Sequence, residues 1–132
     1  MAEPVIDAPI GAGAVVLFEG RTRPLEGETE IGALRYEAYP PMTMLQLEAL
    51  ADRLRREHQL VSIHVEHSVG CVPVGRVSFR LIACAPHRKP ALRAIDDFID
   101  EMKRDVALWK LPVYTKTKVN AALSGKDSIY SS

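Results

Sequence analysis

Two segments near the start of the chain have the hydrophobic pattern of strands. Residues 14–18 form a short apolar run that Gly20 closes. Residues 31–39 have the same character, and Pro40 ends them because proline lacks the N–H that a sheet needs. The polar stretch 21–30 between these segments contains proline and glycine, so we expect an exposed loop there.

A second pair of strands is predicted in the middle of the chain. Residues 60–69 alternate apolar and polar side chains, as a strand buried on one face does. Residues 77–83 alternate again, and the segment 70–75, with two glycines and a proline, predicts the turn between them. The alternation also places His64 and His67 on opposite faces of their strand, which makes them poor partners for one metal ion.

Two helices are predicted. The first begins near Thr43, whose hydroxyl is suited to cap it, and its leucines follow a spacing of three and four residues. The second begins at Pro90, a favoured first residue, and Pro112 stops it. Its apolar stripe comprises Leu92, Ile95, Phe98, Ile99, Met102, Val106 and Trp109.

The order of these elements predicts the fold class. Strand pairs alternate with single helices, which is typical of an α+β domain with two helices on one face of a mostly antiparallel sheet. We expect a single domain over residues 1–132, with an irregular lead-in at 1–12, a last strand at 113–119 and a loose tail at 120–132.

The charge balance narrows the function classes. Lys plus Arg and Asp plus Glu both total 17 among 132 residues, so no broad basic surface is available to bind nucleic acid. No apolar stretch has the length of a membrane span, and no secretory signal begins the chain. The two cysteines lack metal-ligand spacing, and we expect buried thiols, no metal, no cofactor and a cytoplasmic location.

Local cationic clusters are therefore the candidates for chemistry. Arg21 and Arg23 follow the first strand, and His87 and Arg88 precede the second helix, where free N–H groups favour an anion. Such arginines are more often only solvated. From spacing alone they indicate no more than a phosphate or carboxylate pocket.

Lys103 and Lys110 are seven residues apart. On a regular helix they would lie within roughly 20° of each other on one face. The alternative is that both lysines merely complement the helix dipole.

The same segments resemble a known family. Residues 14–23 (AVVLFEGRTR), 34–42 (LRYEAYPPM), 67–75 (HSVGCVPVG), 85–88 (APHR) and 108–110 (LWK) follow, in order, the motifs of the molybdopterin synthase catalytic (large) subunit family. The resemblance spans residues 14–110, most of the chain.

The resemblance implies an α/β-hammerhead-type fold and a homodimer that becomes a heterotetramer with two copies of a small ubiquitin-like sulfur carrier. Each carrier inserts a C-terminal thiocarboxylate, and cyclic pyranopterin monophosphate is converted to molybdopterin. By this resemblance the substrate is held by Arg23, His87 and Arg88, beside a loop that contains Arg21 and Thr22, and the chemistry falls to Lys103 and Lys110.

One segment departs from the family pattern. Leu111 and Pro112 follow Lys110, and neither the family's glutamate nor its later tryptophan is present, since Trp109 is the one tryptophan of the chain. A non-catalytic pterin or phosphate-binding module with the same fold is therefore an alternative. A small anion-binding regulatory domain from outside the family is a third.

Overall fold

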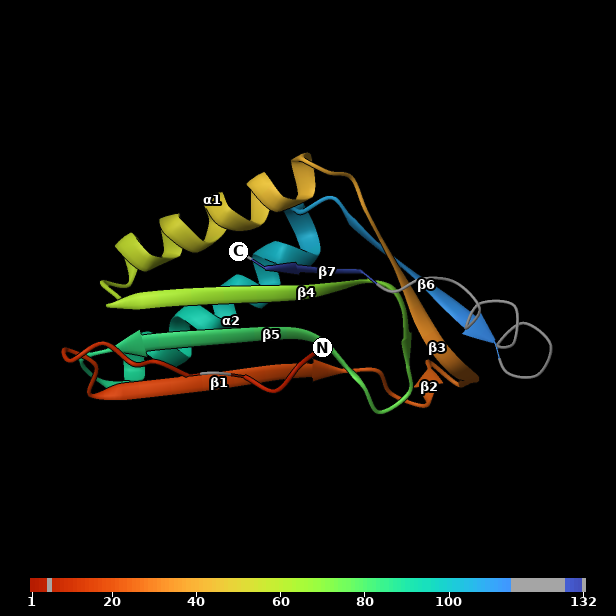
Figure 1. The fold of residues 1–132 in the computed structure, drawn as a ribbon, viewed down its shortest axis with the longest axis horizontal. Helices are drawn as coiled ribbons and strands as arrows, with labels where there is room; N and C mark the ends of the chain where they lie inside the picture. The colour runs from red at the N-terminus through yellow and green to blue at the C-terminus, as the bar shows by residue number, and fades with distance from the viewer. Residues whose placement is uncertain (5, 115–127, 132) are drawn as a thin grey trace.

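Over the residues that the structure describes, the fold is a seven-stranded sheet with two helices (Figure 1). A computed structural model describes residues 1–4, 6–114 and 128–131. The elements, in chain order, are β1 (Ala14–Arg21), β2 (Leu25–Glu26), β3 (Thr29–Ala38), α1 (Met42–Glu57), β4 (Ser62–Pro73), β5 (Val77–Ala85), α2 (Arg88–Asp105), β6 (Leu108–Tyr114) and β7 (Ser128–Ser131).

The sheet bends where β4 passes from one set of neighbours to another. The strand order is β1-β5-β4-β3-β2, with β6 added on β3 and β7 on β4, and all pairs are antiparallel. The first half of β4 pairs with β5, and its last residues pair with β3. Gly70, at the bend, has a φ of 91°, a conformation that residues with a side chain rarely adopt. The bend creates the corner that Figure 1 shows between β4 and β3.

Both helices pack on one face of β1, β5 and β4. Leucines of α1 and Ile95, Phe98 and Met102 of α2 form one buried cluster with the inward residues of these strands. Leu92 and Trp109, which were predicted in the same apolar stripe, are exposed. Phe98 is fully buried at the centre of the cluster and stacks on Phe79, with ring centroids 6.1 Å apart. The predicted α+β class, antiparallel sheet and one-sided helices are confirmed.

The end of the second helix differs from the prediction. α2 ends at Asp105, and the segment from Leu108 leaves the helix to pair with β3. Two side chains of α1 explain the exit: Gln46 accepts the Ala107 N–H at 2.7 Å, and the Thr43 hydroxyl donates to the Ala107 carbonyl. Pro112 lies in β6, whose second edge pairs with no strand within the described ranges, a position that tolerates proline.

Smaller predictions also need correction. Thr43 lies inside α1 and does not cap it, although its hydroxyl accepts the Tyr39 N–H at 2.8 Å. The predicted loop 21–30 contains β2, and β4 extends through most of the predicted turn 70–75.

The ends of the chain bear on three further predictions. The residues described before β1 form no helix or strand, as expected for the lead-in. Most of the predicted tail 120–132, and residues 115–119 of the predicted last strand, lie outside the described residues. Within the tail, Ser128–Ser131 form β7 instead of a loose end.

Candidate functional site

A cavity of about 590 Å³ lies in the corner where the bent sheet meets the end of α2. Seven parts of the chain contribute to its wall: β1, the loop after it, β2, β3, the two central strands β4 and β5, and the segment from α2 to β6. Its volume is in the range of sites for small molecules. The fold thus gathers residues from widely separated parts of the sequence around one space.

The charged residues of this wall are mostly cations. Arg21, Arg23, Lys103 and Lys110 face a single carboxylate, Glu26, which lies 3.5 Å from the Lys110 Nζ. The Arg23 and Lys103 side chains are exposed, and neither has a hydrogen bond or ion pair within the described part of the chain. The charge of Arg21 is paired with Glu19, and the other three cations against one carboxylate still make the wall positive and suited to an anionic ligand.

The rest of the wall is apolar and aromatic. Phe18, Leu34, Phe79, Ile99, Met102 and Leu108 form it, together with Tyr36, His67 and Ser78. Burial raises the pKa of Tyr36, so its hydroxyl stays protonated at neutral pH. Burial also lowers the pKa of His67 to about 4, which keeps its imidazole neutral. A cationic rim over an apolar base fits a flat ligand that bears an anionic group.

The lysines reach this cavity in a way that the sequence did not predict. Lys103 belongs to α2 and Lys110 to β6, so their expected alignment on one helical face is wrong. They line the same cavity because β6 folds back along β3, where Lys110 pairs with Tyr36. The proximity inferred from helical spacing holds, but the helix does not produce it.

Arg21 and Thr22 both form hydrogen bonds with neighbouring parts of the protein. The Arg21 guanidinium donates to Glu19 at 3.0 Å and to the Gly75 carbonyl at 3.1 Å, on the far face of β1. Thr22 is buried and does not line the cavity; its N–H donates to the Arg76 carbonyl. These two residues fix the loop that presents Arg23.

His87 and Arg88 lie at the opposite end of the molecule. His87 is the N-cap residue of α2, both side chains are exposed, and neither lines the cavity. Fifteen residues of helix, about 22 Å at 1.5 Å per residue, separate Arg88 from Lys103. Within one chain, Arg23, Lys103 and Lys110 therefore form one group and His87 and Arg88 another.

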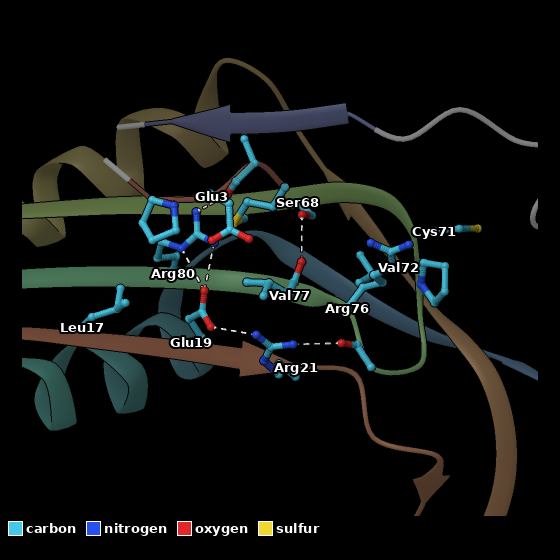
Figure 2. Close-up of a pocket in the computed structure, with 15 residues that line it drawn as sticks. Glu3, Leu17, Glu19, Arg21, Ser68, Cys71, Val72, Arg76, Val77 and Arg80 are labelled. Atoms are coloured by element: carbon cyan, nitrogen blue, oxygen red, sulfur yellow. Dashed lines mark hydrogen bonds and ion pairs between the residues drawn. The ribbon is translucent and has the colours of Figure 1, made fainter. Parts of the chain in front are cut away.

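A second cavity, of about 730 Å³, lies on the face of the sheet away from the helices (Figure 2). Its centre is Arg80, whose buried guanidinium donates to Glu19 at 2.9 Å, to Glu66 at 3.3 Å and to the Ala2 carbonyl at 2.8 Å. Figure 2 shows Glu19 between Arg80 and Arg21. Because these charges already neutralise one another, we assign this larger cavity a structural role.

The Arg80 cluster predicts a pH dependence of stability. Hydrogen bonds from Arg80 and then Arg21 lower the pKa of Glu19 below its ordinary 4.5. A carboxyl whose pKa is depressed by folding contributes stability above its unfolded pKa, and the contribution is lost as pH falls through the folded value. We expect Glu19→Gln to be less stable than the wild type at pH 7 in urea unfolding, with the difference shrinking below pH 4.5.

Glu48→Gln is the matched control, since Glu48 is exposed on α1. It should leave the stability unchanged at both pH values. A Glu19→Gln deficit of equal size at neutral and acid pH would contradict the charge-based explanation.

Two observations concern metal sites and membrane-spanning helices. Across the described residues, no three His, Cys, Asp or Glu side chains come together as a metal ion would require. None of the helices in the same residues is long and apolar enough to cross a membrane.

Comparison with known proteins decides the family. A model of the MoaE protein family matches residues 2–105. The chain belongs to the MoaE protein family. The predicted resemblance is thereby confirmed over most of the chain.

Two relatives within this family are named molybdopterin synthase catalytic subunit. The molybdopterin synthase catalytic subunit of Oryza sativa subsp. indica is 39% identical over 110 residues, 83% of this chain and 57% of that protein. The subunit of the same name from Culex quinquefasciatus is 39% identical over 105 residues, 79% of this chain and 67% of that protein. The chain thus spans little more than half of the rice protein's length.

Solved structures show the same fold. Molybdopterin synthase from Staphylococcus aureus superposes with a TM-score of 0.68 at 26% identity, over 82% of this chain and 79% of that chain. A complex of subunits 1 and 2 of molybdopterin-converting factor from Helicobacter pylori matches with a TM-score of 0.66 at 25% identity, over 79% and 68%.

Proposed function

We propose that this MoaE family member is the catalytic subunit of a molybdopterin synthase. It would convert cyclic pyranopterin monophosphate to molybdopterin, with sulfur from the thiocarboxylated C-terminus of a small ubiquitin-like carrier. The observation that supports this most strongly is the meeting of Arg23, Lys103 and Lys110 in one cavity. The relatives named molybdopterin synthase catalytic subunit support it as well.

The wall of the cavity suits the two halves of this substrate. A guanidinium binds phosphate oxygens through two parallel N–H donors, and Arg23 has no competing partner within the described part of the chain. The pterin is flat, and its ring would pack against the apolar residues of β1, β3 and α2. Phosphate at the rim and pterin at the base is the orientation that the wall favours.

The lysines are placed to assist sulfur transfer. The thiocarboxylate sulfur displaces an oxygen substituent from a substrate carbon and forms a thioester between substrate and carrier, and water then cleaves this thioester to leave sulfur on the substrate and release the carrier's carboxylate. Negative charge develops in both steps, and fixed cations stabilise such transition states. Both lysine side chains are exposed in the chain alone. Their ammonium groups can therefore meet a bound substrate at the open rim of the cavity, where substrate and carrier would enclose them.

The carrier is expected to approach this open rim. The complex of the two Helicobacter pylori subunits is a related protein bound to a second subunit. We infer the same kind of partner here, two carriers on a homodimer, and a cytoplasmic location.

His87 and Arg88 fit this proposal only as residues of a second copy. They lie about 22 Å of helix from Lys103, so they cannot touch a substrate held in their own chain's cavity. If they bind substrate, as the family resemblance implies, they do so in the cavity of the partner protomer. Each site of the homodimer would then need residues from both chains.

This arrangement predicts complementation between two defective chains. We expect Arg23→Ala to weaken substrate binding by about tenfold to a hundredfold, since it removes charged hydrogen bonds, and His87→Ala to weaken it in the same sense. In a mixture of the two variants, a heterodimer places both lesions in one site and leaves the other intact. Equal mixing should therefore restore about one quarter of the wild-type turnover at low substrate, because random pairing makes half the dimers mixed.

Arg93→Ala, an exposed arginine of α2 outside the cavity, is the control and should behave as wild type. Turnover of the mixture no higher than the mean of the two variants would contradict the shared site.

The segment after Lys110 favours one second candidate, a module that binds the pterin without turnover. The sequence places Leu111 and Pro112 where the family pattern has a polar residue and a glutamate. In the structure a carboxylate reaches Lys110 from β2 instead, through Glu26. Incubation with thiocarboxylated carrier and cyclic pyranopterin monophosphate separates the two: the synthase forms molybdopterin, and the module binds substrate but forms none.

A further inference from the structure

His67 occupies the base of the cavity. It is buried on β4, immediately before the bend at Gly70. The Tyr36 ring meets the imidazole edge-on, with centroids 4.8 Å apart, and Phe79 lies 5.7 Å away on the other strand. The ring is thus held by aromatic neighbours while it borders the space in which we propose the substrate binds.

The hydrogen bond of this imidazole fixes its tautomer. Nδ1 lies 2.7 Å from the Ser68 carbonyl oxygen, which can only accept, so Nδ1 bears the proton. The ring is neutral, and Nε2 therefore has a lone pair. Nε2 has no hydrogen-bond partner among the residues that the structure describes. The result is a rigid acceptor at the cavity's base.

Apart from the Tyr36 and Ser78 hydroxyls, few side chains of this cavity can accept a hydrogen bond. The charged groups that line the cavity with His67 are the cations Arg21, Arg23, Lys103 and Lys110, which only donate, and Glu26, which is paired with Lys110. A reduced pterin presents ring N–H groups and an amino group along its edge. A substrate whose phosphate binds Arg23 would therefore need an acceptor deeper in the site.

We propose that His67 binds the substrate, with Nε2 accepting a hydrogen bond from an N–H group of the pterin. This inference rests on the proposed function and adds to it a residue that recognises the pterin half of the substrate. The Ser68 carbonyl oxygen, which accepts from Nδ1 of His67, sets the tautomer and orients the ring. Tyr36 and Phe79 hold the ring plane.

Two substitutions test the roles of the two ring nitrogens of His67 separately. In His67→Asn the amide takes the place of Nδ1 and can still donate to Ser68, but the acceptor at Nε2 is lost. In His67→Gln the longer amide brings its carbonyl oxygen to the position of Nε2. We expect His67→Asn to raise the KM for the pterin about tenfold with a smaller change in kcat, and His67→Gln to retain most of the affinity.

His64→Gln is the control, since His64 lies exposed on the same strand. Equal KM values for the wild type and His67→Asn would overturn the proposal. Thermal unfolding of each variant shows whether a loss reflects the fold.

A measurement on the wild-type protein tests the same role of His67 without any substitution that could disturb the fold. Long-range ¹H–¹⁵N spectra of protein labelled at histidine should show Nδ1–H and an unprotonated Nε2 for His67, and added cyclic pyranopterin monophosphate should shift the Nε2 resonance. Conversion of substrate with an unmoved Nε2 would refute the role of His67 alone. Absence of both binding and conversion would instead refute the proposed function.

Discussion

Lys110→Ala should lose turnover almost completely while the fold survives. The side chain lies on β6 and points its ammonium at the cavity wall, 3.5 Å from Glu26, so it contributes little packing. Removing one fixed group that stabilises developing charge typically lowers kcat by about a hundredfold to a thousandfold. The measurement is the initial rate of molybdopterin formation at saturating substrate and carrier, with circular dichroism as a check on the fold.

Two companion variants sharpen this result. Lys110→Arg keeps the charge but hardly loses its proton, so retained activity indicates electrostatic stabilisation and lost activity indicates proton transfer or covalent catalysis. Arg104→Ala removes a cation next to Lys103 that does not line the cavity, and it should leave the rate unchanged. A wild-type rate for Lys110→Ala would remove Lys110 from the mechanism.

Phe98→Ala should cause the largest loss of stability. The ring is fully buried between α2 and the sheet and stacks on Phe79, so its removal leaves a cavity in the main core. Truncation of a buried phenylalanine costs about 3–5 kcal/mol of unfolding free energy. Urea unfolding at one fixed protein concentration measures it, because the stability of the proposed homodimer would depend on concentration.

Leu92→Ala is the matched control on the same helix. Leu92 is half-exposed, so we expect a change within about 0.5 kcal/mol. A Phe98→Ala loss no larger than that of Leu92→Ala would mean that α2 does not rest on this core. The packing of α2 on the core would then no longer explain the position of Lys103, which lies one helical turn and a residue beyond Phe98.

Much of the fold could be predicted from the sequence because hydrophobic spacing is local. The alternation in residues 60–69 and 77–83 and the part of the second helix's apolar stripe from Leu92 to Met102 correspond to observed elements. The boundary between α2 and β6 could not be predicted, since helical spacing continues through Trp109. What ends the helix is a pair of contacts from α1, Gln46 and Thr43 with the backbone of Ala107, and such contacts exist only in the folded chain.

The candidate site was predicted in part. The cations were identified through the family motifs, and Arg23, Lys103 and Lys110 do line one cavity. Spacing could not reveal that Arg21 borders both cavities and pairs with Glu19, or that His87 lies a helix length away.

Two further residues of the cavity were missed, Glu26 and His67. Glu26 lies in a stretch predicted to be a loop, and its approach to Lys110 depends on how β2 and β6 flank β3. The signal for His67 was present in the alternation, which places it on the face opposite His64, but alternation alone does not distinguish a packed histidine from one at a cavity.

The most direct test of the proposed function combines the purified protein, a thiocarboxylated carrier from the same source and cyclic pyranopterin monophosphate. Molybdopterin is detected as its oxidised fluorescent derivative, with Lys110→Ala and carrier lacking the thiocarboxylate as controls. We predict product in proportion to the wild-type protein, almost none with Lys110→Ala and none with carrier that lacks the thiocarboxylate. Substrate that binds but is never converted, at any carrier concentration, would contradict a synthase and leave a pterin-binding module.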